Sequence, residues 1–173
     1  MIIIWFIIIG FSVFQSANAE EAIEYHVEIK GVKDTILKES LLSHSSTQQQ
    51  QDSPPSSLFA LEHRAKKDIP VFIKLLRSQA YFNSKIIVES EKKEDDTALV
   101  FRFELGKQYL LKQVNIELES DNLAKPSLKQ LNLELEKPAL TTAILNAEQA
   151  LLTHAKNKAY AFAKLCSKKV VVN

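Results

Sequence analysis

Cysteine and glycine are both scarce in this sequence. Its 173 residues include one cysteine, Cys166, and three glycines, Gly10, Gly31 and Gly106. A single cysteine cannot form an internal disulfide, and Cys166 lies far from the N-terminal region where a lipid-attachment site would be. Three isolated glycines exclude a glycine-rich phosphate-binding loop. Because Cys166 has apolar, strand-like sequence around it, we expect it to be a small buried hydrophobic residue rather than a reactive thiol.

An excess of charge of either sign is also absent. The 22 basic residues are balanced by 21 acidic ones, which gives a formal net charge of +1. Nucleic-acid binding needs basic residues concentrated on one face, so this balance argues against nucleic acid as the main partner. A hydrophobic content of 46% in a chain of this length is typical of one or two small globular domains.

The sequence contains no recognisable catalytic or metal-binding motif. None of the histidines has a second ligand three or four residues away: His26, His44, His63 and His154. The acidic residues of EKKEDD, at 91–96, lack the spacing and the glycine of a calcium loop. No Ser, Cys or Thr lies beside a base in a nucleophile motif. We therefore predict a protein that is not an enzyme, with no catalytic residue, no metal site and no cofactor.

An apolar run at the N-terminus indicates export from the cytoplasm. MIIIWFIIIGFSVF, at 1–14, is followed by Ala17-Asn18-Ala19, which matches the small-residue pattern of a signal-peptidase site. The run is shorter than the ~20 apolar residues of a spanning helix. We predict a signal peptide over 1–19, cleaved after Ala19, although the usual basic residues before the run are absent. The alternative is an uncleaved anchor, and the mass of the mature protein distinguishes the two.

The first half of the chain, residues 20–106, begins with a strand and a short helix. IEYHVEIK, at 23–30, alternates apolar and polar residues and predicts a strand with one buried face. Gly31 tolerates a positive φ and suits a turn at the end of this strand. Asp34 is a suitable N-cap for a helix over 34–44.

The remainder of the first half predicts a loop, a second helix and a hairpin. The polar tract SSTQQQQDSPPSS, at 45–57, predicts an unordered loop or linker because it cannot bury enough apolar surface. Helical periodicity over 58–79 predicts a helix that Pro70 should kink or restart. KIIVES, at 85–90, and TALVFRFEL, at 97–105, predict two strands joined by the charged connection EKKEDD.

The second half of the chain, residues 107–173, repeats much of this order. Its predicted elements are a strand at 108–120, a short helical segment at 126–133, a helix at 141–159 and a strand at 159–173. Thr141 or Thr142 can cap the long helix. An Ala-Tyr pair follows the second helix of both halves, at 80–81 and 159–160. We predict an α+β fold of two tandem strand–helix–helix–strand–strand modules, of which the second lacks its last strand.

These segments resemble the tandem POTRA domains of the Omp85 superfamily, and within it those of TamA-like outer-membrane assembly factors. The resemblance lies in the order of IEYHVEIKGV, LEHRAKKD, LLRSQAYFNSKI and FRFELGKQYLLKQVNIEL. The family commonly has Gly-Tyr where both halves here have Ala-Tyr, so we expect these helix ends to close differently. Family members continue through a third POTRA domain into a membrane β-barrel. The resemblance therefore implies N-terminal POTRA domains truncated before the barrel.

The resemblance also implies an architecture and a function. Each module would have two helices on one face of a three-stranded sheet, with the third strand in the centre and the second outermost. The protein would act in the periplasm, associated with the outer membrane, in outer-membrane protein and autotransporter assembly. Its partners would be periplasmic or outer-membrane polypeptides, including a TamB-like partner, with membrane association through partners or through the missing barrel. Without a central strand in the second half, we expect 20–106 to fold stably alone and 107–173 to be loosely ordered or to pair improperly.

The outermost strand is the candidate binding site, because an unpaired strand edge can accept an extended polypeptide as an added strand. The candidate edge consists of Lys85, Ile86, Ile87, Val88, Glu89 and Ser90. The alternative is that Lys85 and Glu89 merely protect this edge and that it binds nothing. A second functional hypothesis is a POTRA-like connector of a cell-envelope or cell-division complex, tethered to the inner membrane by an uncleaved N-terminal helix.

Overall fold

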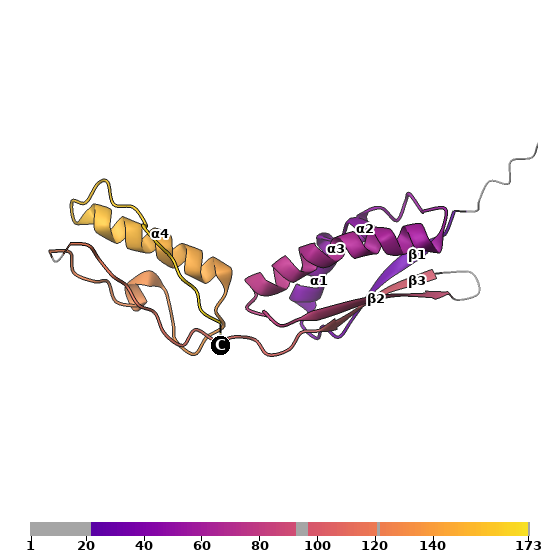
Figure 1. Ribbon diagram of the computed structural model, residues 1–173, viewed down its shortest axis with the longest axis horizontal. Helices are drawn as coiled ribbons and strands as arrows, with labels where there is room; N and C mark the ends of the chain where they lie inside the picture. The colour runs from indigo at the N-terminus through magenta and orange to yellow at the C-terminus, as the bar shows by residue number, and fades with distance from the viewer. Residues whose placement is uncertain (1–21, 93–96, 121, 173) are drawn as a thin grey trace, which may run out of the picture.

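The computed structural model in Figure 1 describes residues 22–92, 97–120 and 122–172. The elements of the first half are β1 (Tyr25–Lys30), α1 (Thr35–Ser43), α2 (Ser46–Gln49), α3 (Leu58–Ser78), β2 (Lys85–Lys92) and β3 (Thr97–Glu104). Those of the second half are a 3₁₀ turn, η1 (Lys129–Leu131), and α4 (Thr141–Asn157). The predicted signal peptide over 1–19 and part of the charged connection, 93–96, lie outside the described residues.

The strands of the first half form one mixed sheet with the order β1-β3-β2. β3 lies in the centre, parallel to β1 and antiparallel to β2. The coarse α+β class is confirmed, and the central position of β3 is the one expected from the resemblance. The hairpin is also confirmed, with β2 extending two residues beyond the predicted end at Ser90.

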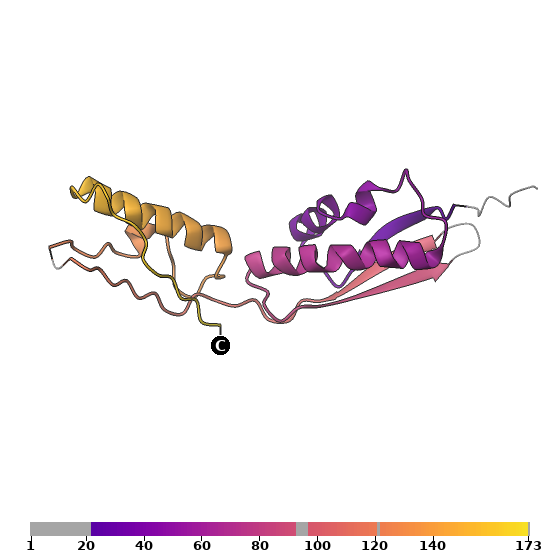
Figure 2. The same cartoon turned by 45° about the horizontal axis from the view of Figure 1, so that its top comes forward.

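Helices α1, α2 and α3 cover one face of this sheet (Figures 1 and 2). Alternate residues of each strand point toward the helices, as period-2 patterning requires. Phe72 of α3 packs against Phe101 and Phe103 of β3, with ring centroids 5.0 and 5.6 Å apart. The buried core of the first half consists of Tyr25, Ile29, Leu37, Leu41, Leu61, Ala65, Phe72, Leu76, Leu99, Phe101 and Phe103.

The turn between β1 and α1 follows the sequence prediction. Gly31 has a φ of +89°, and a Cβ at this position would overlap the carbonyl oxygen of Phe103. Glycine is therefore required both for the backbone conformation and for the close approach of β3. The Asp34 side chain accepts hydrogen bonds from the backbone N–H groups of Ile36 and Leu37, which confirms it as the N-cap of α1.

The tract at 45–57 is a loop over 50–57, as predicted, but the expectation that it is unordered is wrong. Residues Ser46–Gln49 form α2, and the side chains of Ser45 and Thr47 are fully buried. The organising group is the carboxylate of Asp68, which is buried on α3. It accepts hydrogen bonds from Ser45 Oγ (2.6 Å), Ser46 N (3.0 Å), Ser46 Oγ (2.7 Å) and Thr47 N (3.1 Å). Polar contacts thus replace the apolar burial that the tract lacks.

The hydrogen-bond donors around Asp68 determine the direction in which its pKa is shifted. Burial of the carboxyl raises its pKa, but the hydrogen bonds from Ser45, Ser46 and Thr47 outweigh burial, so the pKa lies below the ordinary value of 3.8. The carboxylate also caps the N-terminus of α2, where backbone N–H groups lack helical partners.

The expected restart of the second helix at Pro70 is also wrong, whereas the expected kink stays a prediction. α3 runs without a break from Leu58 to Ser78, with Pro70 inside it. Proline removes one helical N–H donor, which normally favours a kink. The apolar face of α3 packs on the core on both sides of Pro70, through Ala65 and Phe72, and this packing holds the helix in one piece. The helix has Gln79 as its C-cap, close to its predicted end.

Both Ala-Tyr pairs close their helices in the left-handed conformation, so the expectation of a different closure is wrong. Ala80 has a φ of 65° and Ala159 a φ of 71°. Tyr81 N donates to Leu76 O (2.9 Å), and Tyr160 N donates to Ala155 O (3.1 Å). This is the helix end that glycine usually forms. Alanine adopts it here at a cost of about 1–2 kcal/mol.

The second half departs most from the predicted elements. Its helix is confirmed as α4, but Leu140 precedes it without a side-chain cap, and Thr141 is the first helical residue. The short helical segment forms only the turn η1. Neither 108–120 nor 159–173 forms a strand within the described residues, where the one bridge joins Leu110 and Pro138. Cys166, predicted to be buried, is exposed, because its segment belongs to no sheet that could cover it.

Replacing Asp68 with Asn should destabilise the protein by about 1–3 kcal/mol, because an amide cannot accept from all the donors that the carboxylate serves. The folded-state pKa is depressed, so the contribution of Asp68 is present above the unfolded-state pKa of about 3.9 and is lost as the pH falls through the folded-state value. Urea unfolding should therefore show a difference between wild type and D68N at pH 7 that shrinks at pH 3. Asp52→Asn, at an exposed position, is the control; equal stability of wild type and D68N would contradict the prediction.

Replacing Ala159 with Gly should slow hydrogen exchange in the last turn of α4, because Ala159 is exposed and glycine removes about 1 kcal/mol of left-handed strain. Ala80→Gly is the matched comparison. Ala80 is fully buried, so the relief of strain is offset by the loss of a buried methyl group worth about 0.8 kcal/mol. Faster exchange in A159G than in wild type would show that the strain argument is wrong.

Candidate functional site

The six candidate residues lie together in β2, the outermost strand on one side of the sheet. Ile86 and Val88 pack against the core, and Ser90 Oγ donates to Glu62 Oε1 of α3 (3.1 Å). Lys85, Ile87 and Glu89 are exposed on the other face. Ile86 and Ile87 are adjacent, and successive strand residues point to opposite faces, so one of the two must face solvent. That residue is Ile87, which is 50% exposed.

Only one edge of β2 is paired. Its register with β3 runs from Lys85 opposite Glu104 to Lys92 opposite Thr97. No described residue donates to, or accepts from, the backbone of β2 along its other edge. Alternate residues of an edge strand leave both an N–H and a C=O group without a ladder partner. This edge is therefore open to a further strand.

The opposite edge of the sheet, formed by β1, is partly closed. Gln51 Nε2 donates to the carbonyl oxygen of Tyr25 (3.3 Å), and Ile23 N donates to the carbonyl oxygen of Pro55 (2.8 Å). Arg64 holds the same tract by donating to the carbonyl oxygens of Gln50 (3.2 Å) and Ser53 (3.0 Å). The ordered tract thus contacts the start of β1, at Tyr25, and the segment before it, at Ile23, so the two edges of the sheet are not equivalent.

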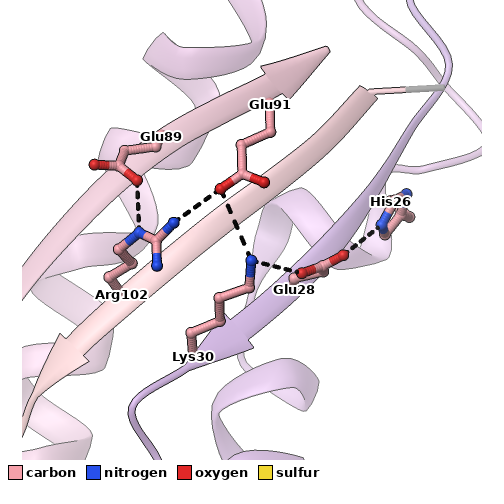
Figure 3. A network of polar contacts seen from close by, with 6 residues as sticks. All are labelled: His26, Glu28, Lys30, Glu89, Glu91 and Arg102. Atoms are coloured by element: carbon pink, nitrogen blue, oxygen red, sulfur yellow. Dashed lines mark hydrogen bonds and ion pairs between the residues drawn. The ribbon is translucent and has the colours of Figure 1, made fainter. Parts of the chain in front are cut away.

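Charged side chains cross the face of the sheet opposite the helices (Figure 3). Arg102 of β3 donates to Glu89 (2.6 Å) and to Glu91 (2.8 Å) of β2. Glu91 also lies 3.8 Å from Lys30 of β1, which in turn lies 3.3 Å from Glu28. His26 Nε2 contacts the other Glu28 oxygen at 3.0 Å. The network links all three strands.

This network has two consequences for the candidate edge. The long side chains cover Ala98 and Val100 of β3, which are fully buried although they face away from the helices. Hydrogen bonding to Glu89, and then its negative charge, raise the pKa of Arg102 above the ordinary value. Arg102 thus keeps a permanent positive charge beside Glu89. The acidic residues of β2 are compensated within the sheet and do not present unpaired charge along its edge.

The sequence pattern located this site only in part. It placed His26, Glu28 and Lys30 on one polar face of a strand, but it assigned Glu91 to the turn. Gln51, which closes the β1 edge, lies in a tract expected to be unordered, and no local signal predicts its contact with Tyr25. The signal for Ile87 was present in the two adjacent isoleucines.

At the candidate edge, the described residues offer unpaired backbone groups and side-chain ion pairs. They contain no group of three or more His, Cys, Asp or Glu residues that could hold a metal ion. Within them, no helix combines the length and apolar character needed to cross a membrane. No family model matches this sequence, and no curated protein is significantly similar to it.

Proposed function

We propose that this protein binds extended partner or client polypeptides along the open edge of β2 by adding a strand to the sheet. The observation that carries the proposal is the asymmetry of the two edges. The ordered tract contacts the first residue of β1 through Gln51, and Ile23 just before it through Pro55, whereas β2 has no backbone partner among the described residues on its outer side. Recognition through backbone N–H and C=O groups tolerates varied side chains, which suits a protein with many clients.

The side chains of β2 favour binding over protection. Edge strands are commonly protected by charges that repel or desolvate a neighbour. Here Glu89 and Glu91 are paired with Arg102, while Ile87 remains half exposed beside them. An added strand can cover Ile87 with an apolar side chain, and cross-strand pairs of this kind contribute roughly 0.2–1 kcal/mol each.

The biological setting that fits this activity is outer-membrane protein assembly in the periplasm, by a POTRA-type scaffold related to TamA-like factors. Its support is the resemblance in sequence order, together with the strand order β1-β3-β2 and the helices on one face of the sheet. Periplasmic location rests on the predicted signal peptide. The partners proposed are periplasmic and outer-membrane polypeptides.

Binding of a labelled extended peptide tests strand addition directly. A peptide of alternating Val and Thr should bind, and hydrogen exchange should show new protection of β2 amides. The same peptide with alternate backbone nitrogens methylated keeps its side chains but loses the donors along one edge. It should bind at least about tenfold more weakly, which corresponds to about 1.4 kcal/mol. Equal binding of the methylated peptide would rule out strand addition.

Ile87→Lys should weaken binding of the unmethylated peptide by about tenfold, because it removes an apolar contact and adds an uncompensated charge at the edge. Ile36→Lys is the matched control, since Ile36 is 79% exposed on α1, away from β2. Fluorescence anisotropy measures both affinities, and circular dichroism checks that both variants remain folded. Unchanged affinity of I87K, or an equal loss in I36K, would place the binding site elsewhere.

A further inference from the structure

The outer edge of β2 is complementary to itself. Two copies of this chain can lay these edges side by side about a twofold axis perpendicular to the sheet, and the two β2 strands then run antiparallel. Such an axis keeps the helices of both copies on the same face, which suits a sheet that carries α1, α2 and α3 on one side (Figures 1 and 2). The unpaired N–H and C=O groups of each edge serve the other edge.

One register of this pairing gives the exposed side chains of the edge suitable partners. With Ile87 on the axis, Ile87 lies opposite Ile87 of the second copy. Lys85 then lies opposite Glu89, and the symmetry repeats this ion pair on the other side of the axis. On the face toward the helices, the half-buried Ile86 lies opposite the half-buried Val88. Opposite charges and apolar side chains that lie directly opposite each other stabilise antiparallel strands.

The neighbouring registers match these side chains less well. Residues directly opposite each other point to the same face, so the axis must pass through a residue. An axis at Val88 places Ile87 opposite Glu89, and an axis at Glu89 places two carboxylates opposite each other. An axis at Ser90 places Glu89 opposite Glu91. Moving the axis the other way shortens the overlap and places Ile87 opposite a lysine. The side chains of β2 therefore select the register centred on Ile87.

The charged groups of this register are available for the contact. Lys85 is exposed and has no ion-pair partner within the described part of the chain. Glu89 bonds to Arg102 through Oε2 (Figure 3), and a carboxylate can accept from a second cation at its other oxygen. Lys85 of a second copy can therefore approach Glu89 without displacing Arg102. The charge left unpaired in one copy is paired in two.

The helix layer carries an apolar residue at the same level. Glu62 of α3 accepts from Ser90 of β2, and the two elements run in opposite directions. Three strand residues, from Ser90 back to Ile87, span about 10 Å, which corresponds to about seven helical residues. Ile69 lies seven residues after Glu62 on the same face of α3 and is half-buried. Both layers thus place an isoleucine near the axis.

We propose that this protein pairs with a second copy of itself through β2, in the register centred on Ile87, and so forms one continuous sheet across a symmetric dimer. The dimer uses the backbone groups that a client strand would use, so the two exclude each other. Self-pairing is then a resting state that protects the edge until a client displaces the second copy. This competition rests on the proposed function, whereas the dimer itself does not.

A pair of charge reversals in the full chain tests the dimer, with sedimentation over a concentration series as the measurement. Lys85→Glu and Glu89→Lys should each weaken self-association by at least about tenfold, because each places like charges opposite each other on both sides of the axis. An equimolar mixture of the two variants should associate as wild type does, since every opposite pair is complementary again. Lys38→Glu, at an exposed position of α1, is the control and should dimerise like wild type. Circular dichroism checks the fold of each variant.

Disulfide formation tests the register. Cα atoms directly opposite each other in an antiparallel pair are about 4.5–5.5 Å apart, which a disulfide can span. With the native thiol removed by Cys166→Ser, Ile87→Cys should oxidise to a covalent dimer, whereas Glu89→Cys should not, because it lies opposite Lys85. A wild-type chain that stays monomeric at every concentration, a mixture of the charge variants that does not associate, or faster cross-linking of E89C than of I87C would overturn the proposal.

The alternating Val and Thr peptide separates this inference from the proposed function. It should bind the monomeric Lys85→Glu variant more tightly than wild type, because no second copy competes for the edge. Binding of the peptide by a wild type that never dimerises would overturn the dimer and leave the proposed function standing. A dimer with the predicted register, together with no peptide binding by K85E, would support the dimer and contradict the proposed function.

Discussion

The arrangement of the first half depends on the backbone hydrogen bonds of β3. A strand in the centre of a sheet satisfies its N–H and C=O groups on both sides, and β3 does so with β1 and β2. Its Phe101 and Phe103 also receive Phe72 of α3, so one strand organises both the sheet and the core. In the second half, 112–119 keeps the alternation of a strand with one buried face, but no described residue pairs with it in a ladder.

A second interaction, the hydrogen bonding of Asp68, orders the tract that contacts the edge of the sheet at the start of β1. The carboxylate gathers Ser45, Ser46 and Thr47 and so orders a tract that has little apolar surface of its own. The same tract supplies Gln51, which contacts Tyr25 of β1, and Pro55, which contacts Ile23 just before β1. The buried carboxylate thus bears on the proposed function, because the tract that it orders contacts the start of β1, while the outer edge of β2 has no such contact among the described residues.

Local sequence patterns were sufficient to predict most of the helices and strands of the first half. Alternation predicted the strands, helical periodicity predicted α3, and the chemistry of Gly31 and Asp34 predicted the turn between β1 and α1. The failures have one cause, which is that tertiary contacts overrode local preference. Packing carried α3 through Pro70, and Asp68 ordered the polar tract from a distant position in the sequence.

The strands expected at 108–120 and 159–173 did not form for a related reason. Alternation predicts a buried face, but it cannot supply a neighbouring strand. The candidate edge was predictable in position, whereas the closure of β1 was not.

Native-state hydrogen exchange of the intact chain tests most directly whether the central strand is what orders the first half. If it is, the amides of β1 and β3 should exchange slowly, while those of 112–119 and 164–172, which have no ladder partner among the described residues, should exchange at rates typical of unpaired backbone. Uniformly slow exchange across both halves would contradict this, because it would require a hydrogen-bonded ladder in the second half.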